Sequence, residues 1–162
     1  MRKRANADGS LAEDLILACT GGMVSSRMAQ QAIRALCRFY GGLQVYIPAR
    51  KESGTSAEKL RGVIADAVGD KAAEEILGKI MRLYGNMQVY FPMEKNAFKK
   101  AIALEIFERS GKNNVTIDDL AREYGISFMQ AYRLWRKGQA EKVKPSMPYL
   151  PFLELGENNN GG

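Results

Sequence analysis

Basic residues recur at helical spacing near the end of this sequence. The stretch Ile126–Lys144 holds five basic residues and one acid, a net charge of +4. On a helix, Arg133 suits the two acceptors on the edge of guanine, and Gln130 suits the acceptor and donor of adenine. Arg136 and Lys137 lie further along, where phosphates are within reach. The chemistry indicated is recognition of duplex DNA.

The stretch Ile117–Leu134 could position these side chains, because it fits the helix-turn-helix template position by position. Thr116 is expected to cap the first helix and Ser127 the second. Ala121 is small where the helices nearly touch, and Gly125 lies in the turn, where a positive φ is needed. The apolar contact positions are Leu120, Tyr124, Ile126, Ala131 and Leu134. A helical hairpin of the same shape that does not bind DNA is the alternative.

If Ala131 and Leu134 face inward, the open sides of the second helix present the candidate DNA-contacting residues. These are Ser127, Phe128, Met129, Gln130, Tyr132, Arg133, Arg136 and Lys137. Trp135 is expected to pack against the preceding helix rather than stack on a base. That helix is predicted over Glu94–Arg109, with Phe98, Ala101, Ile102 and Ile106 on a mainly apolar face, and it ends at Ser110–Gly111.

An internal repeat occupies the first part of the chain. The stretch Tyr40–Pro48 (YGGLQVYIP) recurs as Tyr84–Pro92 (YGNMQVYFP), with six of nine positions identical. Upstream, Ala12–Leu15 (AEDL) is echoed by Ala57–Leu60 (AEKL). A duplication of helix-helix-strand units over residues 10–48 and 55–92 explains both similarities.

Each copy is predicted to hold two helices. Capping boxes are expected at Ser10–Glu13 and Thr55–Glu58, with further helix starts near Ser25 or Ser26 and at Asp70. The apolar stripes are Met28, Ala32, Leu36 and Phe39 in the first copy and Ala73, Ile76, Leu77, Ile80 and Leu83 in the second. Gly41–Gly42 and Gly85–Asn86 end the helices, because glycine takes the left-handed conformation without strain.

A short strand follows each glycine motif, as the alternation of side chains indicates. Leu43, Val45 and Ile47 point one way, with Met87, Val89 and Phe91 as their counterparts; Gln44, Tyr46, Gln88 and Tyr90 point the other way. Each strand needs a partner, either the other copy or a strand of a second chain. The Gln/Tyr face is either a solvated surface or a surface that contacts phosphates or the minor groove.

Composition narrows the class of protein. The 162 residues carry a net charge of +6 and no histidine, which removes histidine-based triads and most zinc sites. Cys19 and Cys37 lie among apolar residues, as buried reduced thiols do. No phosphate loop, metal cluster, cofactor motif or nucleophile–base pair indicates an enzyme or a small-molecule substrate. No stretch is long enough for a membrane span, and we expect a cytoplasmic protein.

The expected fold is therefore mainly α. Residues 1–92 form a duplicated helix-strand dimerisation region with a small β-ribbon, and residues 93–144 form a helix-turn-helix domain. Residues 145–162 form an extended, partly disordered tail that lacks basic residues. The tail either packs on its own domain or docks a partner. In the second case, its deletion spares DNA affinity and abolishes activation.

The order of these elements resembles the Mor/C family of bacteriophage Mu middle and late transcription activators. The likeness covers about Ala57–Lys137, and Gly85–Pro92 is its most specific part. The resemblance implies a dimer with intertwined strands, two helix-turn-helix units in adjacent major grooves and recruitment of host RNA polymerase. It also implies that Gly85, Gln88 and Tyr90 help to fit the protein to DNA.

Two departures from the family pattern bear on assembly. Asn86 replaces the second glycine of the motif, and the helix-strand unit occurs twice beside one helix-turn-helix. The two copies either pair within one chain or build a larger interface between chains. We expect a homodimer, because one short recognition helix binds weakly and paired half-sites are the usual remedy.

Three functions remain open from the sequence. The first is a sequence-specific transcription regulator, with activation favoured by the resemblance. The second is an architectural protein of a mobile element that bends DNA, and the third is a protein-interaction adaptor without a nucleic-acid role. Salt dependence and preference for one DNA site separate them.

Overall fold

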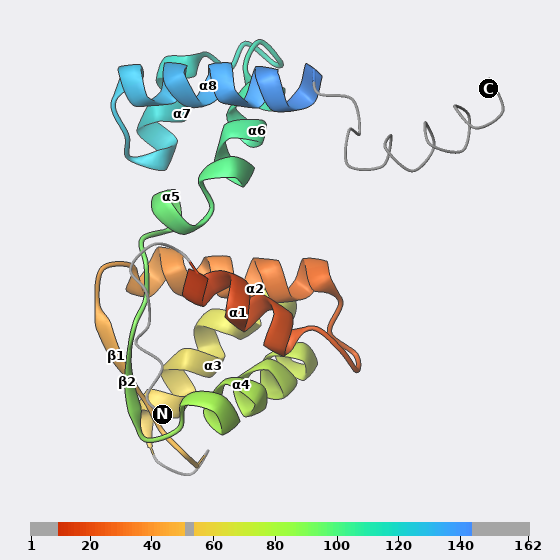
Figure 1. The fold of residues 1–162 in the computed structure, drawn as a ribbon, viewed down its shortest axis with the longest axis vertical. Coiled ribbons are helices and arrows are strands. Elements are labelled where there is room, and N and C mark those ends of the chain that lie inside the picture. The colour runs from red at the N-terminus through yellow and green to blue at the C-terminus, as the bar shows by residue number, and fades with distance from the viewer. Residues whose placement is uncertain (1–9, 51–53, 144–162) are drawn as a thin grey trace, which may run out of the picture. The chain divides into compact units, whose positions relative to one another are not determined.

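The protein is mainly helical, as the sequence predicts. A computed structural model describes residues 10–50 and 54–143, and these hold eight helices and one two-stranded sheet (Figure 1). The helices are α1 (Ser10–Cys19), α2 (Ser26–Tyr40), α3 (Thr55–Val68), α4 (Asp70–Tyr84), α5 (Glu94–Ala97), α6 (Lys99–Arg109), α7 (Ile117–Tyr124) and α8 (Phe128–Val143). The strands are β1 (Gln44–Ile47) and β2 (Met87–Tyr90). The basic N-terminus, Lys144 and the predicted tail at 145–162 lie outside the described residues.

The chain divides into two compact units, with the boundary between Phe98 and Lys99. In the first unit, α1 to α4 pack around an apolar core. Its largest fully buried side chains include Leu15, Ile33, Leu36, Ile64 and Ile76. No polar or charged residue is buried among those the structure describes. The hydrophobic effect therefore provides the main stabilisation of this unit.

Both cysteines belong to that core, as predicted. Cys19 and Cys37 are fully buried free thiols. Burial raises the pKa of Cys19 to about 11 and that of Cys37 to about 12, because the thiolate loses its hydration. Both side chains act as small apolar residues.

The strands β1 and β2 pair with each other in antiparallel fashion within one chain. The register places Gln44 opposite Tyr90, Val45 opposite Val89 and Tyr46 opposite Gln88. Equivalent residues of the two sequence copies thus exchange places across the Val45–Val89 pair, as they would around a two-fold axis. The first unit satisfies its strand pairing without a second chain.

The two ends of each glycine motif have different physical roles. Gly41 and Gly85 have φ values of −55° and −54°, so they do not need a left-handed conformation. A Cβ on Gly41 would lie 2.3 Å from the Cys37 carbonyl oxygen, and one on Gly85 would lie 2.5 Å from that of Met81. The left-handed positions are Gly42 (φ +83°) and Asn86 (φ +63°). The prediction that both glycines of Gly41–Gly42 end the helix by positive φ is wrong for Gly41, which is required by close backbone approach.

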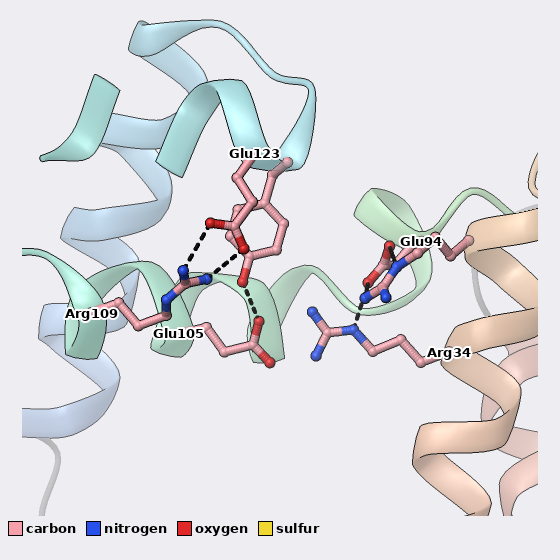
Figure 2. A network of polar contacts seen from close by, with 7 residues as sticks. Arg34, Glu94, Glu105, Arg109 and Glu123 are labelled. Carbon is pink, nitrogen blue, oxygen red and sulfur yellow. Dashed lines mark hydrogen bonds and ion pairs between the residues drawn. The ribbon is translucent and has the colours of Figure 1, made fainter. Parts of the chain in front are cut away.

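The start of α5 is fixed to α2 by a carboxylate that binds two arginines. Glu94 accepts hydrogen bonds from Arg34 Nε at 2.6 Å and from Arg38 Nε and Nη2 at 3.0 and 2.9 Å (Figure 2). The Arg34 guanidinium also lies 5.9 Å from the ring centre of Phe98. Burial raises the pKa of Glu94, but the hydrogen bonds from Arg38 and Arg34 outweigh this effect and hold it below its ordinary value.

Several local predictions are wrong. Phe39 and Leu83, expected in the buried stripes, are 66% and 54% exposed, because the residues that follow them, Tyr40 and Tyr84, are the ones that pack against the core at these helix ends. The predicted helix Glu94–Arg109 is interrupted at Phe98, which has φ −116° and ψ 29°. Gly54 and Gly69, rather than Thr55 and Asp70, occupy the N-cap positions of α3 and α4 and provide no capping side chain.

The second unit is built from α6, α7 and α8, with both other helices in contact with α8 (Figure 1). Its buried apolar side chains are Ile102, Ala103, Ile106, Leu120, Ala121, Ala131 and Leu134. Gly138 lets α8 approach α6 closely. A Cβ at this position would lie 2.1 Å from the Ala103 carbonyl oxygen and 2.7 Å from Phe107 Cβ. This glycine is therefore a packing requirement of the unit.

Candidate nucleic-acid interface

The first helix of the candidate interface, α7, is fixed at both ends. Thr116 Oγ1 accepts a hydrogen bond from the Asp119 amide at 3.1 Å, and the Asp119 carboxylate accepts one from the Thr116 amide at 2.9 Å. This reciprocal capping box confirms Thr116 as the N-cap. At the other end, Gly125 has φ +65° and ψ 37°, and its amide donates to Ala121 and Arg122. The turn therefore uses the positive φ that the sequence predicts.

The second helix, α8, begins with a similar exchange. The Gln130 amide donates to Ser127 Oγ at 3.1 Å, and the Ser127 amide donates to Gln130 Oε1 at 3.0 Å. Two amides at the start of the helix are thereby satisfied. The exchange also uses the carbonyl oxygen of Gln130, one of the two groups that a bidentate contact with adenine requires.

Ring contacts and a hydrogen bond hold α8 against α6. Trp135 Nε1 donates to Ser110 Oγ at 2.8 Å, and the Trp135 ring lies 5.8 Å from that of Phe107. On its other side, Trp135 stacks on Tyr132 at 6.0 Å, and Tyr132 stacks on Phe128 at 6.4 Å. Trp135 thus lies where the sequence predicts, against the preceding helix. Three stacked rings stiffen one side of α8 from its first turn onward.

A second brace ties α6 to the C-terminal end of α7. Arg109 donates two hydrogen bonds of 2.8 Å to the carboxylate of Glu123, and the Tyr124 hydroxyl donates to Glu105 (Figure 2). The paired geometry of guanidinium and carboxylate fixes orientation as well as distance. These contacts fix the orientation of the C-terminal end of α7, from which the Gly125 turn leads into α8.

The outward sides of α8 carry the candidate contact residues. Phe128, Met129 and Tyr132 are 50%, 56% and 39% exposed. Ser127, Gln130, Arg133, Arg136 and Lys137 are also exposed, whereas Ala131 and Leu134 are buried. The structure therefore brings all eight predicted residues of this segment to the surface of one helix and its cap.

The charged residues near the C-terminal end of α8 have ion-pair partners on α6, whereas those nearer its start have none among the described residues. Lys142 pairs with Glu108 at 2.6 Å, and α6 supplies Lys100 as a partner for Glu141 at 3.5 Å. Arg133, Arg136 and Lys137 form no ion pair with any acid in the part of the chain that the structure describes. Three exposed cations thus remain available to an external anion.

The Gln/Tyr face of the ribbon belongs to the other unit. Gln44, Tyr46 and Gln88 are exposed and Tyr90 is half-buried, while the opposite face buries Ile47, Val89 and Phe91 in the core. Tyr46 donates its hydroxyl proton to Asn86 Oδ1 at 2.9 Å. The residue equivalent to Asn86 in the first copy is Gly42, which has no side chain to accept a hydrogen bond from Tyr90. The Gly-to-Asn departure therefore makes the two halves of the face unequal.

Two features of this interface were not predicted. Gly138 continues the inward-facing series of Ala131 and Leu134 at spacings of three and four, and this periodicity is the signal that could have identified it. The capping role of Gln130 could have been predicted from the Ser127-x-x-Gln130 spacing, because this is the spacing of a capping box. Both lie within α8 and its cap.

Other kinds of site find no support in the described residues. Within residues 10–50 and 54–143, no group of three or more metal-ligating side chains could hold a metal ion. No helix in these same ranges is long and apolar enough to cross a membrane.

Comparison with known proteins gives one finding. The chain matches the family model for the Mor transcription activator family over residues 50–150. A search of curated proteins and a search of solved structures each give no match. The matched segment includes β2 and the whole of α3 to α8. It spans more than half of the 162 residues, and the chain belongs to the Mor transcription activator family.

Proposed function

We propose that this protein is a sequence-specific, double-stranded DNA-binding transcription activator that acts with host RNA polymerase. In this proposal α7, the Gly125 turn and α8 form a helix-turn-helix, and α8 lies in the major groove. The observation that supports it best is the group of three exposed cations on α8, Arg133, Arg136 and Lys137, without acidic partners in the described residues. Membership of a family of transcription activators supports the same function.

The rigidity of α8 supports a reading role for this helix. A recognition helix must hold its side chains in register with base edges, and loss of that geometry weakens binding. The Ser127–Gln130 cap, the Trp135–Ser110 hydrogen bond and the close approach at Gly138 fix the start, middle and end of α8. Arg133 remains our candidate for a guanine edge, and Arg136 and Lys137 for phosphates.

For the first unit, we propose that the duplicated helix-strand units form a dimer-like core within one chain. The symmetric register around Val45–Val89 supports this, because it is the arrangement that two identical strands adopt around a two-fold axis. The exposed Gln/Tyr face, with Gln44, Tyr46, Gln88 and Tyr90, is the surface that we propose to contact the DNA backbone or minor groove.

Intrachain pairing of the strands changes the argument for a homodimer. Each strand has a partner in its own chain, so unpaired strands no longer require a second chain. The need for two half-sites remains, because a single recognition helix binds weakly. We propose a monomer in free solution and two copies on DNA, each with its α8 in one half-site. Mass measurement of the free protein and of its complex with a footprinted site tests this directly.

The experiment for the function is a footprint on genomic fragments, followed by affinity measurements on the protected site and on random DNA. We expect a preference for the site of about a thousandfold or more. Arg133→Ala should weaken binding and relax selectivity at one base pair, whereas Arg61→Ala on α3, where Arg61 pairs with Asp70 at 3.1 Å, should leave both unchanged. Equal binding to all DNA would favour an architectural protein, and no binding would favour an adaptor. Either result would overturn the proposal.

Activation is tested separately from binding. In transcription with purified host RNA polymerase, the protein should raise the yield from a promoter that carries its site. A reduced yield would show repression, and an unchanged yield would remove the polymerase from the proposal while leaving DNA binding intact.

A further inference from the structure

The first turn of α8 exposes two large apolar side chains next to each other. Phe128 and Met129 are 50% and 56% exposed, and Tyr132, one turn further on, is 39% exposed. Large apolar groups gathered at one place on a surface mark a site of interaction. The second unit therefore offers an apolar contact next to its free cations.

The two aromatic side chains, Phe128 and Tyr132, are held in position before any partner arrives. Phe128 stacks on Tyr132 with an angle of 15° between the rings, and Tyr132 stacks on Trp135 with an angle of 16°. Trp135 is in turn hydrogen-bonded to Ser110. A chain of contacts thus fixes the Phe128 ring to the body of the unit, and little conformational freedom is lost when it meets a partner.

The polar group at this end of the helix is already used. Gln130 Oε1 accepts the Ser127 amide at 3.0 Å, so one of its two lone pairs is already used and the side chain is held toward the helix start. The first turn of α8 otherwise offers mainly the apolar side chains of Phe128 and Met129 to a base.

The neighbouring charges indicate which partner covers this surface. Arg133, Arg136 and Lys137 follow on the same helix without acidic partners among the described residues. A polyanion complements this group, whereas an apolar protein surface would leave the cations desolvated. In the major groove, the C5-methyl group of thymine is the one apolar group on the base edges.

We infer that Phe128 and Met129 read thymine methyl groups, so that the specific site contains thymine under the first turn of α8. This inference rests on the proposed DNA-binding function and names the bases that one part of the interface selects. Tyr132 acts as a positioning residue, because its ring supports that of Phe128.

The test uses the full-length protein and a binding site selected from random duplexes. Each thymine of the selected site is replaced in turn by deoxyuridine, which removes the methyl group and keeps base pairing. We expect a loss of affinity of about fourfold per buried methyl group at one or more positions. In Phe128→Ala and Met129→Ala, this loss should disappear at the position that each residue reads.

Two variants serve as controls. Phe128→Leu keeps an apolar contact and should keep part of the sensitivity to uracil. Phe39→Ala removes an aromatic side chain of the first unit that is 66% exposed. This variant should keep the full sensitivity to uracil. Circular dichroism of each variant establishes that it is folded.

The possible failures are distinguishable. A protein that selects no site overturns the proposed function itself. A protein that selects a site but tolerates uracil at every thymine overturns only this inference, as does uracil sensitivity that persists in the Phe128→Ala/Met129→Ala double variant. If the double variant retains DNA affinity and loses activation, this surface binds a protein and the inference is again overturned.

Discussion

The two units of the molecule arrange their cations differently. In the first, Arg34 and Arg38 are used to neutralise Glu94, and the outward face of the ribbon carries uncharged amides and phenols. In the second, acids on α6 and α7 pair with Arg109, Arg122 and Lys142, yet Arg133 and Lys137 on α8 have no acidic partner in the described residues. Paired charges thus hold elements together. Among the described residues, exposed cations without an acidic partner also occur in the first unit, where Arg27, Lys59 and Lys71 lie on separate helices, whereas α8 gathers three on one helix.

The strongest expected effect on stability lies in the second unit. Gly138→Ala places a Cβ against the backbone of Ala103, and α8 must shift away from α6. We expect a loss of about 3 kcal/mol in the free energy of unfolding, at the upper end for an overpacked site. Thermal and urea denaturation followed by circular dichroism measure it.

Gly62→Ala is the matched control in the first unit. Gly62 lies within α3, and a Cβ there meets no other atom within 4 Å. The same substitution should stabilise the protein by about 0.5–1 kcal/mol, because alanine favours the helix. Equal effects at the two positions would contradict the close approach of α6 and α8.

The next effect concerns the paired charge of the first unit. Glu94→Gln removes the charge that two arginines share, and we expect a loss of about 2 kcal/mol at pH 7. Because the pKa of Glu94 is lowered in the folded protein, its stabilisation is complete above the ordinary carboxyl value of 4.5. That stabilisation is lost as the pH falls through the lowered pKa.

Urea denaturation of both proteins between pH 7 and pH 3 tests this dependence. The difference in the free energy of unfolding between wild type and Glu94→Gln should shrink steadily toward the acid end. A difference that stays constant would show that the carboxylate charge is not the source of the effect.

A smaller effect distinguishes the two copies of the repeat. Asn86→Ala should cost about 1–2 kcal/mol, because alanine is strained at φ +63° and the hydrogen bond from Tyr46 is lost. Gly42→Asn, which makes the first copy like the second, should cost less than Gly42→Ala, since asparagine tolerates this conformation better. Identical costs for Asn and Ala at position 42 would argue against the left-handed role. Chemical denaturation measures all three variants.

The smallest effect is expected at the cap of α7. Thr116→Ala removes the side chain that accepts the Asp119 amide and should cost about 1 kcal/mol. Thr116→Ser retains the hydroxyl and should restore most of that loss. Denaturation curves of the two variants measure this difference. Equal free energies of unfolding for Thr116→Ala and Thr116→Ser would show that the capping box does not stabilise this unit.

The sequence could predict the features that depend on residues close together in the chain. The Thr116 cap, the Gly125 turn, the inward positions Ala131 and Leu134 and the two short strands all follow from residue types a few positions apart. That the strands pair with each other was left open by the sequence. Most residues of the predicted stripes are buried, and the errors fell on Phe39 and Leu83 at the helix ends, where Tyr40 and Tyr84 contact the core instead. Periodicity predicts a face, but which residues at its edge are buried depends on the neighbouring helices.

The features that escaped prediction depend on contacts between distant residues. The break at Phe98 lies beside Arg34, 64 positions earlier in the chain, and Glu94 is bound by arginines of α2. Gly41 looked like a left-handed glycine, but it is required because Met93 and the Cys37 carbonyl leave no room for a Cβ. No local pattern reports such proximity. The DNA-contacting roles of the exposed residues stay predictions.

The central claim is that α8 binds DNA through its unpaired cations, and the salt dependence of binding tests it most directly. Affinity for the footprinted site should fall linearly on a log–log plot, with a slope of about −0.9 for each phosphate contacted. Arg136→Ala/Lys137→Ala should reduce the magnitude of that slope by about 1.8, two contacts at 0.9 each, while Arg61→Ala leaves it unchanged. An unaltered slope in the double variant, or no binding by the wild type at low salt, would contradict the account.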